Sequence, residues 1–163
     1  MNLPDPTPDW LTRLQENGYR LTAPRQAVVE IIATSQHLLT PYAVFERARA
    51  RAPKLGLVTV YRTVEKLEGL GLIQRVHQPS GCHAFVAAFA GHQHLLICQD
   101  CGRVEYFSGD KLEPLMSHVG SESGYHIQDH WLQLFGVCAG CQIEGNSGHP
   151  HPPAPSPTVG RGE

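Results

Sequence analysis

The chain has 163 residues, enough for one ordinary domain or two small ones, and 41% of them are hydrophobic. It contains no run of about 18 apolar residues, so we expect no membrane-spanning segment. The opening MNLPDPTPDW lacks the basic and apolar stretches of a signal peptide. We therefore expect a cytoplasmic protein whose thiols stay reduced.

Charge is divided unevenly along the chain, although the net charge is only −2. Residues 1–77 carry ten Lys and Arg against seven Asp and Glu, whereas residues 78–163 carry three against eight. The second part also holds eight of the ten histidines. A basic part followed by an acidic part rich in histidine indicates two different functions.

Helix signals dominate the basic part. Helices are predicted over residues 20–35, 40–53 and 59–71, where apolar residues recur at helical spacing. Thr22 and Thr40 are candidate N-caps, because a proline that suits the first helical turn follows each of them. Pro24 comes two residues after Thr22, and Pro41 comes directly after Thr40. Pro53 is expected to stop the second of these helices.

A β-hairpin is predicted next, over residues 72–86, with strand-like runs on either side of the turn-forming sequence QPSG (78–81). Three helices followed by a hairpin form a winged helix-turn-helix, whose third helix enters the major groove of DNA. We therefore predict a DNA-binding domain over residues 1–86, followed by a hinge at 87–91 that is rich in small residues.

The acidic part is predicted to be a small α/β unit over residues 92–144, which makes the fold class α+β. Strands are expected at 94–98 and 103–107, a short helix within 109–121, and a long strand over 125–138. From Gly145 to Glu163 the sequence is rich in Pro, Gly and Ser, and we expect a disordered tail.

Four of the five cysteines form two CxxC pairs, Cys98–Cys101 and Cys138–Cys141, whose inner members are separated by 36 residues. Two such pairs are typical of a tetrahedral Zn²⁺ site, in which each pair supplies two thiolates. Redox-active pairs and two unrelated pairs are the alternatives, but a thioredoxin-like site needs one CxxC beside a βαβ pattern. A structural zinc site is therefore the favoured interpretation.

Several further residues are candidate metal ligands. His92 and His94 lie two apart at the start of a predicted strand, so both side chains point to one face. With Glu113 and His130 they form a nitrogen and oxygen donor set that suits a divalent transition metal, although an isolated HxH is more often surface decoration. Cys82 is either a small buried hydrophobe or a further ligand beside His83.

Taken together, the chain resembles the ferric uptake regulator (Fur) family of bacterial metal-dependent repressors from about Leu11 to Gln142. The resemblance rests on GYRLTAPRQAVVEII, GLVTVYRTVEKLEGLGLI, HQHLLICQDCGRVEYF and HWLQLFGVCAGC. It implies an N-terminal winged helix, a C-terminal dimerisation domain, and a homodimer that binds AT-rich palindromic DNA when metallated. It also implies a regulator of metal homeostasis genes that is not an enzyme and has no membrane partner.

The resemblance assigns roles residue by residue. Cys98, Cys101, Cys138 and Cys141 match the structural zinc site, and His92, His94, Glu113 and His130 match a regulatory metal site. Thr59, Tyr61 and Arg62 match the DNA recognition helix, and Tyr19, Arg20 and Arg25 match an earlier DNA-contacting segment.

One site of the family is altered in this chain. A second sensor site in many members uses histidines at positions that are Gln93 and Leu95 here. A rebuilt site would use Cys82 with His77, His83 or His37, and a thiolate ligand favours Zn²⁺ over Fe²⁺ or Mn²⁺. We therefore expect a zinc-sensing repressor. Iron or manganese sensing is the alternative, and a metal-dependent hydrolase or a zinc-stabilised interaction module is the alternative from another class.

Overall fold

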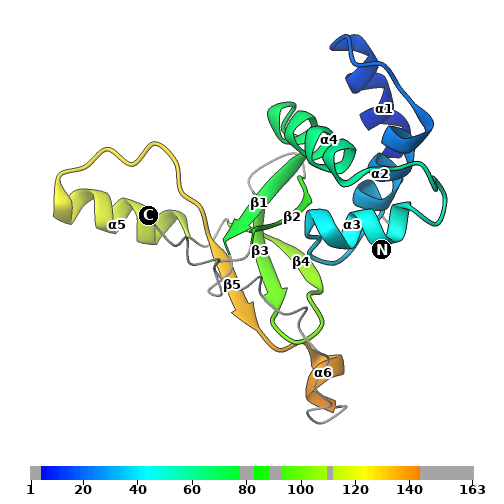
Figure 1. Cartoon of the computed structure of the whole chain (residues 1–163). Coiled ribbons are helices and arrows are strands. Elements are labelled where there is room, and N and C mark those ends of the chain that lie inside the picture. Colours follow the sequence, from blue (N-terminus) through cyan, green and yellow to red (C-terminus); the bar gives the residue numbers. More distant parts are fainter. Residues whose placement is uncertain (1–4, 78–82, 89–92, 110–111, 144–163) are drawn as a thin grey trace, which may run out of the picture.

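The structure is a computed structural model that describes residues 5–77, 83–88, 93–109 and 112–143 (Figure 1). The tail expected at 145–163 and residues 89–91 of the expected hinge lie outside this range. Within it, no helix has the length and apolar character needed to cross a membrane. The described residues combine a helical N-terminal part with small sheets, which confirms the α+β class.

The basic part of the chain forms a bundle of helices. In chain order these are α1 (Thr7–Glu16), α2 (Ala23–Ala33), α3 (Pro41–Ala48) and α4 (Leu57–Gly69). The helices α2 to α4 correspond to the predicted ones, whereas α1 was not predicted as a separate helix. Its signal in the sequence is Trp10 and Leu14, which lie four residues apart and are both buried.

The N-cap expected at Thr40 is present, because its hydroxyl oxygen accepts a hydrogen bond of 3.1 Å from the amide of Ala43. The expected stop at Pro53 is wrong, since α3 ends at Ala48. The amides of Arg51 and Ala52 both donate to the carbonyl of Ala48, so a turn closes the helix before the proline is reached.

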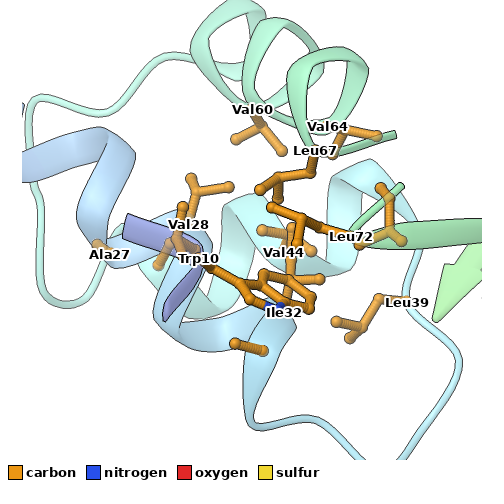
Figure 2. Packing of buried hydrophobic residues seen from close by; sticks show 14 of the residues in the cluster. Trp10, Ala27, Val28, Ile32, Leu39, Val44, Val60, Val64, Leu67 and Leu72 are labelled. Carbon is orange, nitrogen blue, oxygen red and sulfur yellow. The ribbon is translucent and has the colours of Figure 1, made fainter. Parts of the chain in front are cut away.

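The helices share one hydrophobic core (Figure 2). Trp10 reaches from α1 toward Val28 and Ile32 of α2, and Leu67 of α4 closes the core from the other side. Leu14, Val28, Ile32 and Leu67 are all fully buried. Burial of an aliphatic or aromatic side chain is worth about 1.5–3 kcal/mol, so these side chains hold the helices together.

The predicted hairpin follows α4 as β1 (Ile73–His77) and β2 (His83–Ala87), which pair antiparallel. The register places Ile73 opposite Ala87 and His77 opposite His83. The expected turn at 78–81 lies outside the described residues. Helices followed by this hairpin form the winged helix that the sequence predicts.

A second sheet has the strand order β4-β3-β5. The pair β3 (Gln93–Cys98) and β4 (Val104–Ser108) is antiparallel, whereas β5 (Gln133–Gly136) runs parallel to β3. The connection from β4 to β5 contains α5 (Glu113–Ser123), with its proline in the first turn as predicted. After β5 comes the short helix α6 (Ala139–Ile143), which was not predicted.

The long strand predicted over 125–138 is wrong, because only residues 133–136 are in a strand. The pairing explains the difference. Leu95 of β3 lies opposite Gln133, and the described part of β3 begins at Gln93, so within the described residues no part of β3 lies opposite positions before 131. The segment 125–132 therefore runs from α5 to the sheet without regular structure.

The wing and the second sheet pack against each other. Val76 of β1 and Val86 of β2 form a cluster with Leu95, Ile97 and Val104 of β3 and β4. The hydroxyl of Tyr106 also donates a hydrogen bond of 2.8 Å to the carbonyl of Ala87. The winged helix and the C-terminal unit therefore share an apolar contact in the described residues.

The segment between α2 and α3 joins both units through its backbone. Leu39 exchanges hydrogen bonds with Phe85 of the wing, at 3.0 and 2.9 Å. The amide of Leu38 donates to the carbonyl of Gly102 at 2.8 Å, and the amide of Val104 donates to Gln36 at 2.9 Å. Residues 36–39 thus bridge β2 and the turn between β3 and β4.

Candidate metal centre and DNA-binding face

The four paired cysteines come together at one end of the second sheet. Their sulfur atoms all lie within 4.8 Å of one another, and no other group of three or more candidate ligands does so among the described residues. Cys98 Sγ is 3.9 Å from Cys141 Sγ, and Cys101 Sγ is 3.8 Å from Cys138 Sγ. A disulfide needs about 2.05 Å, so these thiols are not bonded to each other.

Both pairs sit on tight turns that the local sequence favours. The first pair spans the turn between β3 and β4, where Gly102 has φ 72 and the Gly102 amide donates to the carbonyl of Cys98 at 3.0 Å. In the second pair, Cys138 directly precedes α6 and Cys141 lies within this helix. The amide of Gln99 donates to Gly136 at 2.8 Å and so holds the two turns side by side.

Electrostatics at the site favour a thiolate at Cys98. Burial raises the pKa of the Cys98 thiol, but backbone hydrogen bonds from Cys101, Cys138 and Asp100 outweigh this effect and lower the pKa to about 6. The amide of Cys138 lies 3.3 Å from Cys98 Sγ. Burial raises the pKa of Cys101, and the neighbouring sulfur atoms raise that of Cys141. Proximity of the four sulfur atoms thus opposes deprotonation of all four thiols. A bound cation would balance the charge of four thiolates.

The geometry fits zinc. A tetrahedron with Zn–S bonds of about 2.3 Å has edges of about 3.8 Å, close to the sulfur separations of 3.8 and 3.9 Å. All four donors are sulfur, and such a closed set leaves no open position for a substrate. The residues present thus suit a structural zinc ion that would hold Cys98, Cys101, Cys138 and Cys141 together.

The predicted regulatory ligands are brought together in part. His94 of β3 is buried, and its ring centroid lies 5.0 Å from that of His130 and 5.4 Å from that of Phe107. Glu113 is exposed at the start of α5, and Glu113, His94 and His130 do not form a group whose ligand atoms all lie within 4.8 Å of one another. His92 lies outside the described residues.

The structure brings together only some residues of the candidate second sensor site. His77 and His83 face each other across the wing and are both exposed. His37 pairs with Arg103, on the segment that bridges the wing and the second sheet. Since Leu39 pairs antiparallel with Phe85, His37 lies toward the Ala87 end of β2 and not toward His83. Cys82 lies outside the described residues.

The helix α4 presents the predicted DNA-contacting residues on its outer side. Val60, Thr63, Val64 and Leu67 face the core, whereas Tyr61 is 49% exposed and Arg62 is also exposed. Thr59 is half-buried in the first turn. The inward face is therefore fixed by packing, and the outward face is free for a ligand.

Residues of the earlier segment lie next to this helix. The ammonium of Lys66 on α4 is 4.3 Å from the centroid of the Tyr19 ring, a cation–π contact. The guanidinium of Arg25 donates to the carbonyl of Arg20, which orders the turn before α2. Lys66 was not among the predicted site residues. Its position one helical turn after Arg62 on α4 is the sequence feature that could have indicated it.

The profile of the ferric uptake regulator family matches residues 16–135. The chain belongs to this family. Its members are metal-responsive, DNA-binding transcriptional regulators that act as dimers, and they are not enzymes. Family membership thus confirms the predicted class of function and excludes the metal-dependent hydrolase.

Individual relatives agree with this assignment. The ferric uptake regulation protein of Cupriavidus metallidurans is 35% identical over 126 residues, which cover 77% of this chain and 88% of the relative. That of Brucella suis is 33% identical over 135 residues, covering 83% and 96%. The solved structure of a zinc-bound manganese uptake regulator is 28% identical with a TM-score of 0.67, covering 79% of this chain and 98% of that one.

Proposed function

We propose that this Fur-family regulator senses zinc and, as a cytoplasmic homodimer, represses metal homeostasis genes at AT-rich palindromic operators. The observation that carries the proposal is the close approach of His94 and His130, at a ring distance of 5.0 Å, outside the four-cysteine cluster. Two imidazoles from separate segments provide a place for a second ion, distinct from the structural one. Imidazole ligands suit Zn²⁺ but also Fe²⁺, so the choice of zinc over iron or manganese rests on the thiolate of Cys82.

His94 and His130, with Glu113 and His92, form the proposed regulatory set. His94 lies on β3, whereas His130 and Glu113 belong to the connection between β4 and β5, which has little contact with the sheet. Ligation by all of them would fix this connection onto β3. Leu95, next to His94, belongs to the same buried cluster as Val76 and Val86 of the wing, so ordering of His94 would also order the contact with the DNA-binding unit.

The backbone bridge at 36–39 supports a mechanical link to the helix-turn-helix. Leu38 binds the turn after Cys101, and Thr40, two residues later, caps α3. A zinc ion held by the cysteines would fix the turn at Gly102, and through Leu38 and Thr40 it would help to position α3. An ion that prefers the DNA-competent arrangement a hundredfold stabilises it by about 2.7 kcal/mol.

Cys82 is the proposed ligand that makes the protein selective for zinc. It directly precedes His83, which faces His77 across the wing, and His37 is the further candidate. A thiolate with imidazoles selects Zn²⁺ over Fe²⁺ and Mn²⁺. The competing interpretation is that Cys82 only packs in the wing.

DNA contact is proposed for Thr59, Tyr61 and Arg62 on α4 and for Tyr19, Arg20 and Arg25 before and within α2. Exposure of Tyr61 and Arg62 supports this role. Replacement of Arg62 by alanine should weaken operator binding by about 1–3 kcal/mol without changing metal content. Wild-type affinity for the R62A protein at several salt concentrations would contradict the groove assignment.

The decisive experiment measures operator binding against free Zn²⁺, Fe²⁺ and Mn²⁺ for wild type, Cys82→Ser and His130→Ala, all with the structural zinc in place. We expect Zn²⁺ to act at the lowest concentration, and both variants to need at least tenfold more of it. A zinc midpoint for Cys82→Ser within twofold of wild type would remove Cys82 from the site. Tighter response to Fe²⁺ or Mn²⁺ would replace the zinc proposal by the iron or manganese alternative.

A further inference from the structure

The first turn of α4 exposes an apolar side chain that the fold does not use. Val58 is 64% exposed, whereas Val60 and Val64 on the same helix are buried at 0% and 8%. The inward face of α4 is already filled by Val60, Val64 and Leu67, which belong to the main core. Burial within this chain therefore does not explain a valine at position 58.

Val58 lies on the face that carries the proposed DNA-contacting residues. Tyr61 and Arg62 follow it at i+3 and i+4, so the three side chains project from one side of the helix. Arg62 is exposed, and Lys66 follows one turn later. Arg62 and Lys66 favour a polyanion, whereas the exposed Glu65 opposes one at the C-terminal end of the face, and Val58 adds an apolar group at its N-terminal end.

The N-terminal end of α4 is open and free of opposing charge. Residues 56–64 contain no Asp or Glu, whereas Glu65 and Glu68 lie in the C-terminal half of the helix. A side chain at Gly56, the N-cap position, would meet no atom within 4 Å. A recognition helix uses its N-terminal residues on base edges, so Val58 is placed where bases are contacted.

A valine can distinguish bases in only one way. It has no hydrogen-bonding group, and the apolar feature that the major groove offers is the 5-methyl group of thymine. We propose that Val58 is a specificity-determining residue that contacts the 5-methyl group of one thymine in each half-site. This inference rests on the proposed DNA-binding function and extends it to a residue that the sequence did not indicate.

The test uses a duplex selected from a random-sequence pool by the zinc-loaded wild-type protein. Each thymine of a half-site is replaced in turn by deoxyuridine, which removes only the methyl group. Loss of one buried methyl should weaken wild-type binding about fourfold at one position, and more when both half-sites are changed. The same duplexes are then measured with Val58→Ala, Val58→Thr and the control Ile143→Ala, whose side chain is 85% exposed on α6, far from α4 (Figure 1).

We expect Val58→Ala to bind the thymine and deoxyuridine duplexes equally, and Ile143→Ala to retain the wild-type difference. Val58→Thr, which keeps one methyl of the valine, should retain part of it. Equal binding of both duplexes by wild type, or an unchanged difference in Val58→Ala, would overturn the proposal. Failure of the wild-type protein to select any duplex would instead contradict the proposed function, so the two failures are distinguishable. Circular dichroism and zinc content confirm that each variant is folded.

Discussion

The helical part and the C-terminal unit of this protein are stabilised in different ways. The helices α1 to α4 surround a core that includes Trp10, Leu14 and Ile32, all buried. None of the residues of α5, each of which is described, is buried, and Figure 1 shows this helix projecting away from the sheet. The buried cluster of the second sheet includes Val76 and Val86, which belong to the wing.

This difference shows what the zinc site and the dimer contribute. A unit with little core of its own needs a metal crosslink or a partner subunit to remain folded. The four-cysteine cluster closes the sheet at one end, and exposed apolar residues remain on the surface: Leu96, Leu115, Val119, Trp131 and Leu134. We expect the N-terminal part, in contrast, to fold without a metal, because it has a large buried apolar core.

The largest effect should come from Cys138→Ser. A structural zinc site contributes folding free energy of order 10 kcal/mol in small modules. We expect loss of zinc, loss of the dimer and unfolding of the C-terminal unit, while α1 to α4 keep their helical signal. Metal analysis, sedimentation and circular dichroism measure the three. Cys82→Ser is the matched control, and a stable zinc-loaded dimer of Cys138→Ser would show that the comparison is wrong.

A charge on the open sheet face should separate the subunits. Leu96 and Leu134 are paired across β3 and β5 and are 42% and 44% exposed, which is unusual for neighbouring leucines. If the partner subunit covers them, Leu134→Asp buries an unpaired carboxylate and weakens the dimer by about 3 kcal/mol or more. Sedimentation equilibrium measures the change, and Ile143→Asp on α6 is the control. A Leu134→Asp protein with wild-type dimer affinity would place the interface elsewhere.

Truncation in the helical core should be smaller than the loss of zinc and confined to the other part. Ile32 is fully buried at the centre of the core (Figure 2), so Ile32→Ala should destabilise the helical part by about 2–5 kcal/mol. Zinc content and the dimer should be unchanged. Denaturant unfolding followed by far-ultraviolet circular dichroism measures the loss. Release of zinc from the Ile32→Ala protein would mean that the two parts unfold together.

The smallest effect concerns the ion pair between α4 and the wing. Arg75 donates to both carboxylate oxygens of Glu68, at 2.5 and 2.7 Å, and this contact lowers the pKa of Glu68. Because both groups are partly exposed, Glu68→Gln should cost only about 0.2–1 kcal/mol. A lowered pKa means that the contribution is present above the unfolded pKa and is lost as the pH falls through the folded one. The wild-type and variant stabilities should therefore converge in acid, and a gap that widens there would contradict this assignment.

Local signals in the sequence predicted most elements correctly. Thr40 caps its helix through a bond to Ala43, three residues away, so the signal and its effect lie within one turn. Each CxxC pair likewise depends on a short local segment. The prediction that the two pairs come together is confirmed by the cluster of four cysteines. The pattern also singled out His94 and His130, whose rings do approach, although spacing alone left the HxH ambiguous.

Other features depended on residues far away in the chain. The strand predicted over 125–138 is confined to Gln133–Gly136, which pair with Leu95–Cys98 of β3 in the described part of the chain. Apolar alternation within one segment cannot reveal the length of the strand beside it. The helix α3 ends at Ala48, before Pro53, because a turn follows Ala48. The helix α1 forms because Trp10 and Leu14 pack in the core. Their spacing of four residues is a weak local signal, and a helix of 10 residues is marginal without such packing.

The sequence by itself determined which residues are candidate metal ligands, the approximate positions of helices α2 to α4, and the family to which the chain belongs, since each depends on residue type and short spacing. Only the tertiary structure decided that the wing shares a core with the second sheet and that residues 36–39 connect the cysteine turn to the helix-turn-helix. It also decided that Val58 faces outward while Val60 faces inward. These outcomes depend on which apolar surfaces become buried against each other on folding. That choice depends on segments far apart in the chain, so local sequence patterns do not determine it.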